Sequence, residues 1–445
     1  MRVTQSMLAL NTLRHISQGY ERLGKLQDQL ASGKKITRPS QDPVVAMNGM
    51  RYRSQVVEVK QFNRNIGEVY NWLDNADSTL DKTTAALHRI RELAVQAAND
   101  TYESTQRANI AKEIEQLFYH VVEMANTKSN GKYIFNGTDT IHAPVDPEKI
   151  DLGIGAIDKY GNKELLEISY AGEIYKFVSE NGSDAVFVNS KGEKMTIRGY
   201  NTDSPTIEHE YITQGLPETG KFNNPEDIKL SFEGKQFDFI SNTGNEYTFG
   251  YDSETITINL TDPQPTITYK KEGANEKTLS EKQIGYYGTE ILKEKQIVVS
   301  DRTAVSTNME DVKIELLKGV TIATNIRPQN VFSNALFGDI IALKNMLEDP
   351  ETSHEDITKF MDIFDKHIDR FVSERAELGA RVNRAEMIEQ RQLELDVIAQ
   401  RIMSDNEDAD MEEVIIQLTI QESVHRAALA AGARIIQPTL MDFLR

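Results

Sequence analysis

The sequence contains no cysteine, which excludes disulfide bonds, thiolate-bound metals and cysteine nucleophiles. It has no run approaching the roughly 18 apolar residues of a membrane-spanning helix, so no membrane insertion is expected. Residues 1–7, Met-Arg-Val-Thr-Gln-Ser-Met, lack the apolar stretch of a cleaved signal peptide. We therefore expect a protein that is either cytosolic or exported by a route that does not read such a signal.

Positive charge is in the minority, because 50 Lys and Arg residues oppose 69 Asp and Glu residues for a formal net charge of −19. This balance excludes a general affinity for nucleic acid. The charge is also uneven, since residues 1–60 are net basic and residues 351–445 are net acidic. This asymmetry favours the two ends lying side by side; the alternative is ordinary scatter over solvated surfaces.

No residue pattern indicates catalysis or a bound metal. The eight histidines never pair at metal-ligand spacing, and no Gly-x-Ser-x-Gly or phosphate-binding loop occurs. The acidic run 405–410 lacks the glycine of a calcium loop, and a helix-capping linker explains it better. The sequence therefore argues against an enzyme and indicates no cofactor and no metal.

Heptad spacing dominates the N-terminal third. Apolar positions alternate steps of three and four through Ile66, Val69, Leu73, Ala76, Leu80, Thr83, Leu87, Ile90, Ala94 and Ala97. The series extends backwards through Phe62, Val59, Gln55 and Tyr52. So long a repeat is typical of a coiled coil. A helix over 44–99 would be roughly 80 Å long, which exceeds a compact domain.

The C-terminal third repeats this spacing. The first part of the series is Ile357, Met361, Phe364, Ile368, Phe371, Arg375, Leu378, Val382 and Ala385. The phase then slips by one residue and resumes as Ile388, Gln392, Leu395, Ala399 and Ile402. Such a slip predicts a local change of supercoil or of packing partner. An alanine-rich last helix follows, with Asp410 as its N-cap.

Shorter helices are predicted near both ends of the chain. One covers about residues 5–32 and stops at Gly33, and another ends at Asn130-Gly131 as a left-handed cap. Between the first helix and the long one, Pro39 forbids helix and Asp42-Pro43 restarts it. We expect the basic residues of this connection to lie in water, namely Lys34, Lys35 and Arg38.

Between about 140 and 310 the pattern changes to period two, as in Gln236–Ile240 and Thr255–Leu260, with turn residues between the segments. We therefore expect an α+β fold: an elongated α-helical coiled-coil bundle built from both chain ends, with an inserted, mainly antiparallel β domain. The predicted parts are residues 1–42 with 405–445 (a terminal helix pair), 43–140 with 311–404 (the long-helix bundle) and 141–310 (the β domain).

The terminal helices carry more apolar surface than a two-helix pair can bury. Either they fold back onto the long helices, or other subunits complete their packing. We favour the second, because a hairpin loop, rather than the longer spacer at 33–42, would suffice for folding back. The predicted assembly residues are Leu13, Ile16, Tyr20, Leu23, Leu30, Leu418, Leu429, Ile435 and Ile436.

Several phrases of the sequence resemble the conserved ends of the bacterial flagellin family. They are SGKKITRPSQDPVVA (32–46), IRELAVQAANDT (90–101), GKYIFNGTDT (131–140), ERAELGARVNRAE (374–386) and residues 408–445. Within the family, the Pro-Ser-x-Asp-Pro form at 39–43 is similar to that of junction subunits. Filament subunits usually carry an alanine- and aspartate-rich phrase there. A middle of about 170 residues is large for a junction subunit.

The resemblance implies a function in assembly. The terminal helices would pair as the inner layer of a tube, with the long helices outside them and the middle domain facing solvent. The implied function is a structural adaptor at the hook-filament junction, outside the cell after type III export. The implied partners are hook-associated protein 1, flagellin, other copies of the chain and a cytosolic export chaperone. The alternatives are the bulk filament subunit and an unrelated soluble coiled-coil scaffold.

Overall fold

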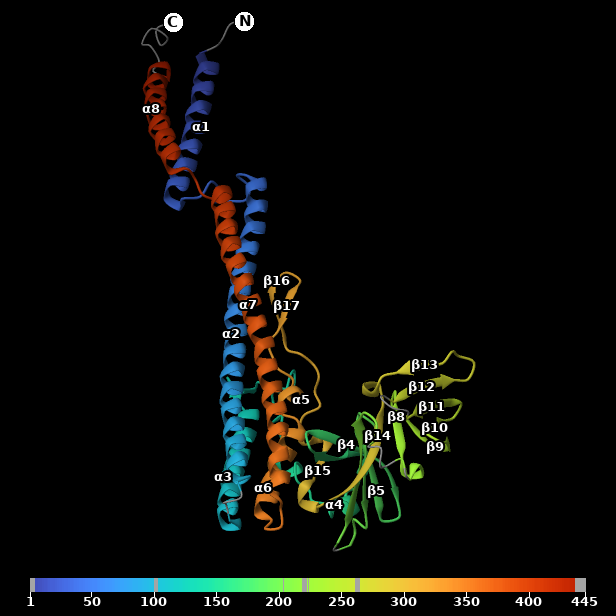
Figure 1. The fold of residues 1–445 in the computed structure, drawn as a ribbon. Coiled ribbons are helices and arrows are strands. Elements are labelled where there is room, and N and C mark those ends of the chain that lie inside the picture. The colour runs from blue at the N-terminus through green and yellow to red at the C-terminus, as the bar shows by residue number, and fades with distance from the viewer. Residues whose placement is uncertain are drawn as a thin grey trace, which may run out of the picture. The chain divides into compact units, whose positions relative to one another are not determined.

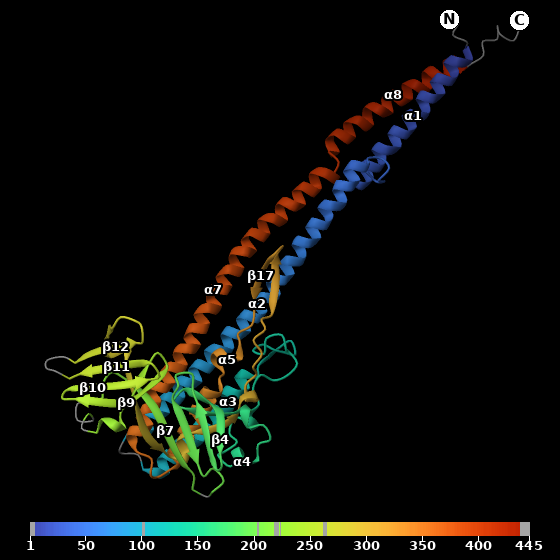
Figure 2. The same ribbon diagram turned by 90° about the vertical axis from the view of Figure 1, so that its right-hand side faces the viewer.

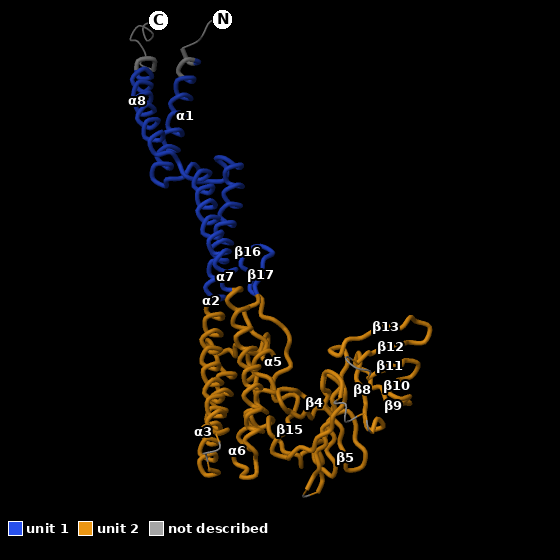
Figure 3. The backbone as a smooth tube through the Cα atoms, in the orientation of Figure 1, with its two compact units in different colours: residues 1–70, 314–322, 382–445 blue, residues 71–313, 323–381 orange. Residues whose placement is uncertain are grey.

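The computed structural model describes residues 5–99, 103–202, 204–217, 222, 224–260 and 265–436. The chain divides into two compact units, which Figure 3 shows in different colours. Unit 1 consists of residues 1–70, 314–322 and 382–445. Unit 2 consists of residues 71–313 and 323–381.

Long helices come from both ends of the chain (Figure 1). The helices are α1 (Gln5–Ser32), α2 (Pro43–Ala97), α3 (Ser104–Ala125), α4 (Ala156–Lys159), α5 (Pro328–Val331), α6 (Asn334–Glu348), α7 (His354–Glu407) and α8 (Met411–Ile436). The two longest, α2 and α7, each contribute residues to both units. α7 is continuous through the predicted phase slip near Ala385.

The heptad positions predicted for α2 are its buried face. Every position of the forward series from Ile66 to Ala97 is buried, whereas in the backward extension Gln55 is exposed. In α7 the aromatic positions Phe364 and Phe371 are completely buried in unit 2. The stripe forms because residues three and four apart share one face of an α-helix.

The predicted helix ends are also found. Gly33 adopts a φ of 69°, the left-handed conformation that terminates a helix. The Asp42 carboxylate accepts hydrogen bonds from the backbone N–H groups of Val44 and Val45 at 3.0 and 3.1 Å. Asp410 accepts equivalent bonds from Glu412 and Glu413. Each carboxylate satisfies N–H groups that lack a partner in the first helical turn.

One predicted helix end is wrong. α3 ends at Ala125, and Asn130-Gly131 instead forms the turn of a hairpin between β1 (Lys128–Ser129) and β2 (Lys132–Tyr133). Both turn residues have positive φ, 50° and 79°. Asn-Gly is the preferred pair for such a two-residue hairpin turn, as well as for a helix cap.

Gln392 of α7 is a polar residue on a buried heptad position of unit 1. Its side-chain amide donates to the Val59 carbonyl at 3.2 Å, and its own carbonyl oxygen has no hydrogen-bond partner. Because a helical carbonyl is already bonded within α2, Gln392→Leu is expected to raise the free energy of unfolding by about 1 kcal/mol in urea titrations. Exposed Gln400→Leu on the same helix should change it little. A destabilised Gln392→Leu variant would contradict this expectation.

The middle of the chain forms one antiparallel 13-stranded sheet, with strand order β13-β12-β11-β10-β9-β8-β14-β7-β6-β5-β4-β3-β15. Its strands are β3 (Leu166–Tyr170), β4 (Glu173–Asn181), β5 (Asp184–Val188), β6 (Lys194–Arg198), β7 (Thr206–Gln214), β8 (Lys229–Phe232), β9 (Lys235–Thr243), β10 (Glu246–Tyr251), β11 (Glu254–Asn259), β12 (Thr266–Lys271), β13 (Lys277–Leu279), β14 (Gly285–Leu292) and β15 (Val298–Asp301). A separate hairpin joins β16 (Lys313–Leu317) and β17 (Val320–Ala323).

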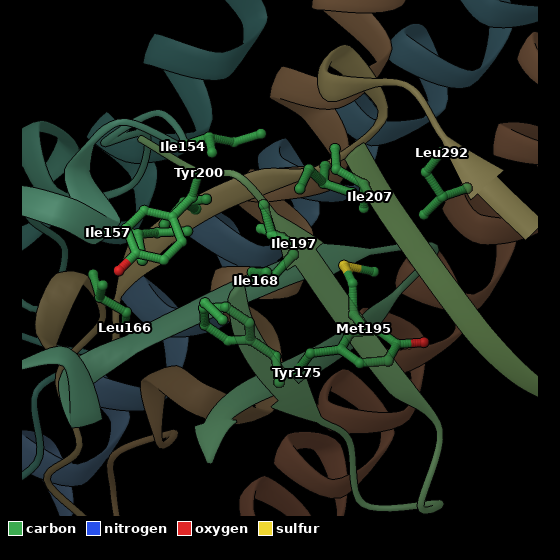
Figure 4. Close-up of a cluster of buried hydrophobic side chains, with 14 residues drawn as sticks. Ile154, Ile157, Leu166, Ile168, Tyr175, Met195, Ile197, Tyr200, Ile207 and Leu292 are labelled. Carbon is green, nitrogen blue, oxygen red and sulfur yellow. The ribbon is translucent and has the colours of Figure 1, made fainter. Parts of the chain in front are cut away.

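The sheet has two apolar cores. Figure 4 shows the first, where side chains from β3, β4, β6 and β7 gather around Ile168, Tyr175 and Ile197. The second core is formed by side chains of β8–β12 and includes Leu230, Phe237, Phe249, Ile256 and Ile267. Strands β3 and β15 pack against α6, where Gly338 lies so close to Ser169 that an added Cβ would be 2.3 Å from the Ser169 Cβ.

The predicted fold class is therefore confirmed: the chain is α+β, with long helices from both ends and a central antiparallel sheet. The three-part domain division predicted from the sequence stays a prediction. The two compact units divide the chain at other points, within α2 and α7.

Candidate assembly surface

Helices α1 and α8 lie side by side and antiparallel in unit 1 (Figures 1 and 2). Gly19 faces His425 and Gln421, whereas Gly432 faces Ile16 and Thr12, about two helical turns further along α8. An added Cβ at either glycine would come within 3.3 Å of the facing side chain. The glycines therefore allow the two backbones to approach closely.

The contact between the helices buries one narrow stripe. Leu23 of α1 and Val414 of α8 are buried, and the Tyr20 ring meets the His425 ring edge-on with 4.2 Å between centroids. The stripe on α8 contains small or polar residues at several positions, such as His425 and Gly432. The apolar area removed from water along the pair is therefore limited.

Large apolar side chains remain exposed on both helices. On α1 they are Met7, Leu10, Leu13 and Tyr20. On α8 they are Met411, Ile415, Ile416, Ile420, Val424 and Leu429. Since the described part of these helices leaves them exposed, the alternative in which they fold back onto the long helices is not observed.

The exposed residues of α8 extend most of the way around the helix. Each residue is turned by about 100° from the one before it. Ile416, Ile420 and Val424 therefore share one face, away from the stripe of Val414 and His425 that contacts α1. Exposed apolar residues that continue beyond the face in contact with α1 are typical of a helix that contacts a further neighbour.

The predicted assembly residues divide into three groups. Leu13, Tyr20 and Leu429 are exposed, and Ile16, Leu30 and Leu418 are partly buried. Leu23 is buried. The side chains of Ile435 and Ile436 lie outside the described residues. The assembly function of all nine stays a prediction.

The sequence prediction did not include several of the most exposed apolar residues. On this helix the prediction named Leu418, Leu429, Ile435 and Ile436 and left out Ile416, Ile420 and Val424. The signal was present in the run Val-Ile-Ile-Gln-Leu-Thr-Ile at 414–420, which has apolar residues on more than one helical face.

A buried carboxylate lies where the terminal helices join the long ones. Glu407 at the end of α7 accepts two hydrogen bonds from the Arg53 guanidinium, at 2.6 and 2.7 Å. Lys34 bridges Glu407 at 3.4 Å and Asp408 at 2.7 Å. Gly49 makes room for this carboxylate, because a Cβ there would lie 2.8 Å from a Glu407 oxygen.

Backbone hydrogen bonds reinforce this joint. The Lys35 N–H donates to the Glu407 carbonyl at 2.7 Å, and the Ala409 N–H donates to the Gly33 carbonyl at 2.9 Å. Of the basic residues of the connection, Lys35 and Arg38 are exposed as expected, whereas Lys34 is only partly exposed and its ammonium group is paired with two acids. The expectation that the basic and acidic chain ends lie side by side is confirmed here.

The joint is expected to loosen at acid pH. Hydrogen bonds from Arg53 lower the pKa of Glu407, and a hydrogen bond from Lys34 lowers the pKa of Asp408. A lowered pKa in the folded state gives stability that is present above the unfolded pKa, near 4, and is lost as pH falls through the folded value. The protection of the Lys35 and Ala409 amides against hydrogen exchange should therefore decrease below about pH 4.

Glu407→Gln is the matched control for the pH effect, because it keeps the size of the side chain and removes its titration. Its amide protection at Lys35 and Ala409 should be lower at neutral pH and should change less between pH 6 and pH 3. The same pH profile in both proteins would contradict the assignment to this joint.

Among the described residues, no group of three or more His, Asp or Glu side chains gathers closely enough to hold a metal ion. No helix in the described ranges is both long and apolar enough to span a membrane.

Residues 3–140 match the family model of the bacterial flagellin N-terminal helical region. Flagellar hook-associated protein 3 of Escherichia coli K12 is 29% identical over 150 residues, 34% of this chain and 47% of that protein. Flagellin of Bacillus subtilis 168 is 29% identical over 161 residues, 35% of this chain and 53% of that protein. The chain thus spans about half the length of these curated relatives.

Solved structures of flagellar proteins also match the chain, at low TM-scores. A putative flagellar hook-associated protein from Vibrio parahaemolyticus has a TM-score of 0.44 and 12% identity, covering 83% of this chain and 100% of that one. The flagellar junction protein FlgL from Legionella pneumophila has a TM-score of 0.34 and 16% identity, covering 81% and 100%. The sequence matches above carry the conclusion: residues 3–140 are similar to the bacterial flagellin N-terminal helical region, and the relatives that the chain matches are structural proteins of the flagellum rather than enzymes.

Proposed function

We propose that the chain is a structural adaptor of the flagellum, which assembles at the hook-filament junction next to hook-associated protein 1 and templates flagellin polymerisation. The observation that carries the proposal is the apolar surface exposed on α1 and α8. The relatives named flagellar hook-associated protein 3 support the adaptor over other flagellar functions. The Pro-Ser-x-Asp-Pro phrase at 39–43, which resembles the corresponding phrase of junction subunits, also supports the adaptor.

The mechanism is completion of the helix pair by neighbouring copies. Burying a large apolar side chain contributes roughly 1.5–3 kcal/mol, before the cost of ordering the subunit. The six exposed side chains of α8 are therefore enough to hold a subunit in a lattice. Because the exposed faces of the pair differ, they suit head-to-tail contacts, which build rings or helical layers.

The proposed layers follow the predicted parts of the chain. Residues 1–42 with 405–445 form the inner layer, 43–140 with 311–404 form the next, and 141–310 face solvent. The subunit reaches this place outside the cell by type III export, in a largely unfolded state. A cytosolic chaperone covers the apolar C-terminal helix before export.

The second candidate is the bulk filament subunit, which the flagellin relatives at similar identity favour. Deleting the gene separates the two. An adaptor mutant is expected to keep its hooks, lose its filaments and release flagellin monomers into the medium. A motile mutant with normal filaments would contradict the adaptor, and loss of the bulk filament protein itself would favour the second candidate.

Direct localisation completes the test. Antibody labelling of purified hook-basal bodies with filament stubs should mark one short zone between hook and filament. Label along the whole stub would instead identify a filament subunit.

A further inference from the structure

Two segments of the sheet region repeat one another. Residues 164–188 read ELLEISYAGEIYKFVSENGSDAVFV, and residues 226–250 read EDIKLSFEGKQFDFISNTGNEYTFG. At this constant offset of 62 positions the identical pairs are Glu164 and Glu226, Ser169 and Ser231, Gly172 and Gly234, Phe177 and Phe239, Ser179 and Ser241, Gly182 and Gly244, and Phe187 and Phe249.

A second pair of matching phrases lies further along the chain. Leu-Ser-Glu-Lys-Gln-Ile at 279–284 matches Leu-Lys-Glu-Lys-Gln-Ile at 292–297. Each forms a short 3-10 turn, η5 (Glu281–Gln283) and η6 (Glu294–Gln296). In both turns the glutamine side chain accepts a hydrogen bond from the backbone three residues earlier, Ser280 at 2.9 Å and Lys293 at 2.8 Å.

Backbone conformation follows the same offset. Ala171 and Glu233, two of the few non-glycine residues with positive φ, have values of 52° and 50°. Gly182 and Gly244 have values of 66° and 65°. The register also shifts at the same place in both segments, between Phe177 and Ser179 and between their counterparts Phe239 and Ser241. Irregular features at matching positions are not required by β structure alone.

Strand pairing also matches between the two repeated segments. Ser169 pairs with Val298, and their counterparts Ser231 and Gly285 pair with each other. At the opposite end Ile207 pairs with Leu292, whereas Ile267 pairs with Leu279. The two apolar cores match position by position, for example Ile168 with Leu230, Tyr175 with Phe237 and Ile197 with Ile258.

We infer that the 13-stranded sheet is a nested internal duplication, in which one seven-strand repeat is inserted into a hairpin of the other and forms a separable module. Repeat A consists of residues 162–214 and 288–301, and repeat B consists of residues 224–287. Strand β14 serves both repeats: its first residues pair with β8 and close repeat B, and its whole length pairs with β7. The insertion point in repeat A corresponds to the hairpin between β12 and β13 of repeat B.

The two repeats differ in what they contact. In repeat A the Gly172 N–H donates to Asp339 at 3.2 Å, and the Ser169 hydroxyl donates to the Asn334 carbonyl at 3.1 Å, so this repeat is attached to α6. The equivalent Gly234 of repeat B has no atom within 4 Å of the position of an added Cβ. Strands β9–β13 also lie away from the helices of unit 2 in both views (Figures 1 and 2). Repeat A therefore attaches the sheet to α6, whereas the equivalent turn of repeat B makes no such contact at Gly234.

The duplication specifies how repeat B can be removed. His209 pairs with Glu290 in repeat A as Tyr269 pairs with Lys277 in repeat B. Replacing residues 211–289 of the full chain with residues 271–276, Lys-Glu-Gly-Ala-Asn-Glu, should therefore close repeat A with the turn of its own duplicate. The design keeps the His209–Glu290 contact and the Lys194–Glu210 ion pair.

Hydrogen exchange of the shortened chain tests the inference. We expect β3–β6 to keep amide protection within about threefold of the full chain, because all their pairings remain. Loss of protection throughout repeat A would overturn the inference, since an inseparable sheet cannot lose half of its strands.

A matched pair of point variants gives a second, independent readout in the full chain. Phe187 and Phe249 are counterparts, and both are completely buried. Phe249→Ala is expected to reduce protection at least tenfold in β9–β12 and to leave β3–β6 unchanged, while Phe187→Ala affects β3–β6. Equal loss in both repeats from Phe249→Ala would show a single cooperative sheet and would overturn the inference.

Discussion

Ile420→Asp is expected to leave the monomer folded and to abolish its self-association. Ile420 is 57% exposed on α8, in the group with Ile416 and Val424, so the isolated subunit loses little from the change. In a lattice the same side chain would be covered by a neighbour, and an unpaired carboxylate there costs several kcal/mol. Since each 1.4 kcal/mol is tenfold in affinity, association should weaken by a factor of 100 or more.

Sedimentation of the purified chain over a range of concentrations measures this effect, and restoration of filaments in the deletion strain measures it in the cell. The matched controls are Val178→Asp on β4 and Ile240→Asp on β9, whose side chains are 60% and 59% exposed. Like Ile420→Asp, each control replaces an exposed aliphatic side chain with a carboxylate, but neither residue lies on the terminal helices. Equal loss of association in all three variants, or normal association of Ile420→Asp, would remove the basis of the proposed assembly surface.

The shortened chain without repeat B adds a separate test that rests on the proposed function. Because repeat B lies outside unit 1, where α1 and α8 pair, the shortened chain should self-associate as the full chain does. If the full chain does not self-associate, the proposed function fails, while the hydrogen-exchange test of the duplication still stands. The two failures are therefore distinguishable.

The helices could be predicted from the sequence because their determinants are local. The positions from Ile66 to Ala97 are buried since heptad spacing alone places them on one face. Gly33, Asp42 and Asp410 end or begin helices by bonding to neighbours within a few residues. Asn130-Gly131 failed as a helix end because the same dipeptide suits two structures with positive φ, and tertiary packing decided between them.

The joint around Glu407 could not be predicted, because its partners Arg53 and Lys34 are more than 350 positions away in the chain. Only the opposite charge of the two ends indicated that such contacts form. The duplication is a different case. Its constant offset from Asn162 to Phe187 is visible in the sequence alone, and a search for internal repeats would have shown it.

Asp339 of α6 is a buried carboxylate that joins three segments of unit 2. One of its oxygens contacts the His367 ring nitrogen of α7 at 2.7 Å, and the other accepts from the Gly172 N–H at 3.2 Å. The side chains of Asp339 and His367 are only 1% and 3% exposed. This carboxylate therefore fixes the β3–β4 turn of the anchoring repeat onto the two helices.

Asp339→Ala is expected to lower the free energy of unfolding by about 3–5 kcal/mol, because it leaves the buried His367 ring and the partly buried Gly172 N–H without this partner. Urea titration measures the loss. Asp365→Ala is the matched control, since Asp365 also joins α7 to another helix through Arg91, but both of those side chains are partly exposed. Exposed ion pairs contribute about 0–1 kcal/mol, so this control should change stability little.

The double variant Asp339→Ala with His367→Ala measures how strongly the two side chains are coupled. Removing both polar side chains leaves only the Gly172 N–H without its acceptor. The double variant should therefore lose less free energy of unfolding than the sum of the losses in Asp339→Ala and His367→Ala. An Asp339→Ala variant no less stable than Asp365→Ala would show that the Asp339 contacts do not hold the turn. In that case the hydrogen bonds that join Ser169 and Glu167 to Asn334, with the close approach at Gly338, would still attach repeat A to α6.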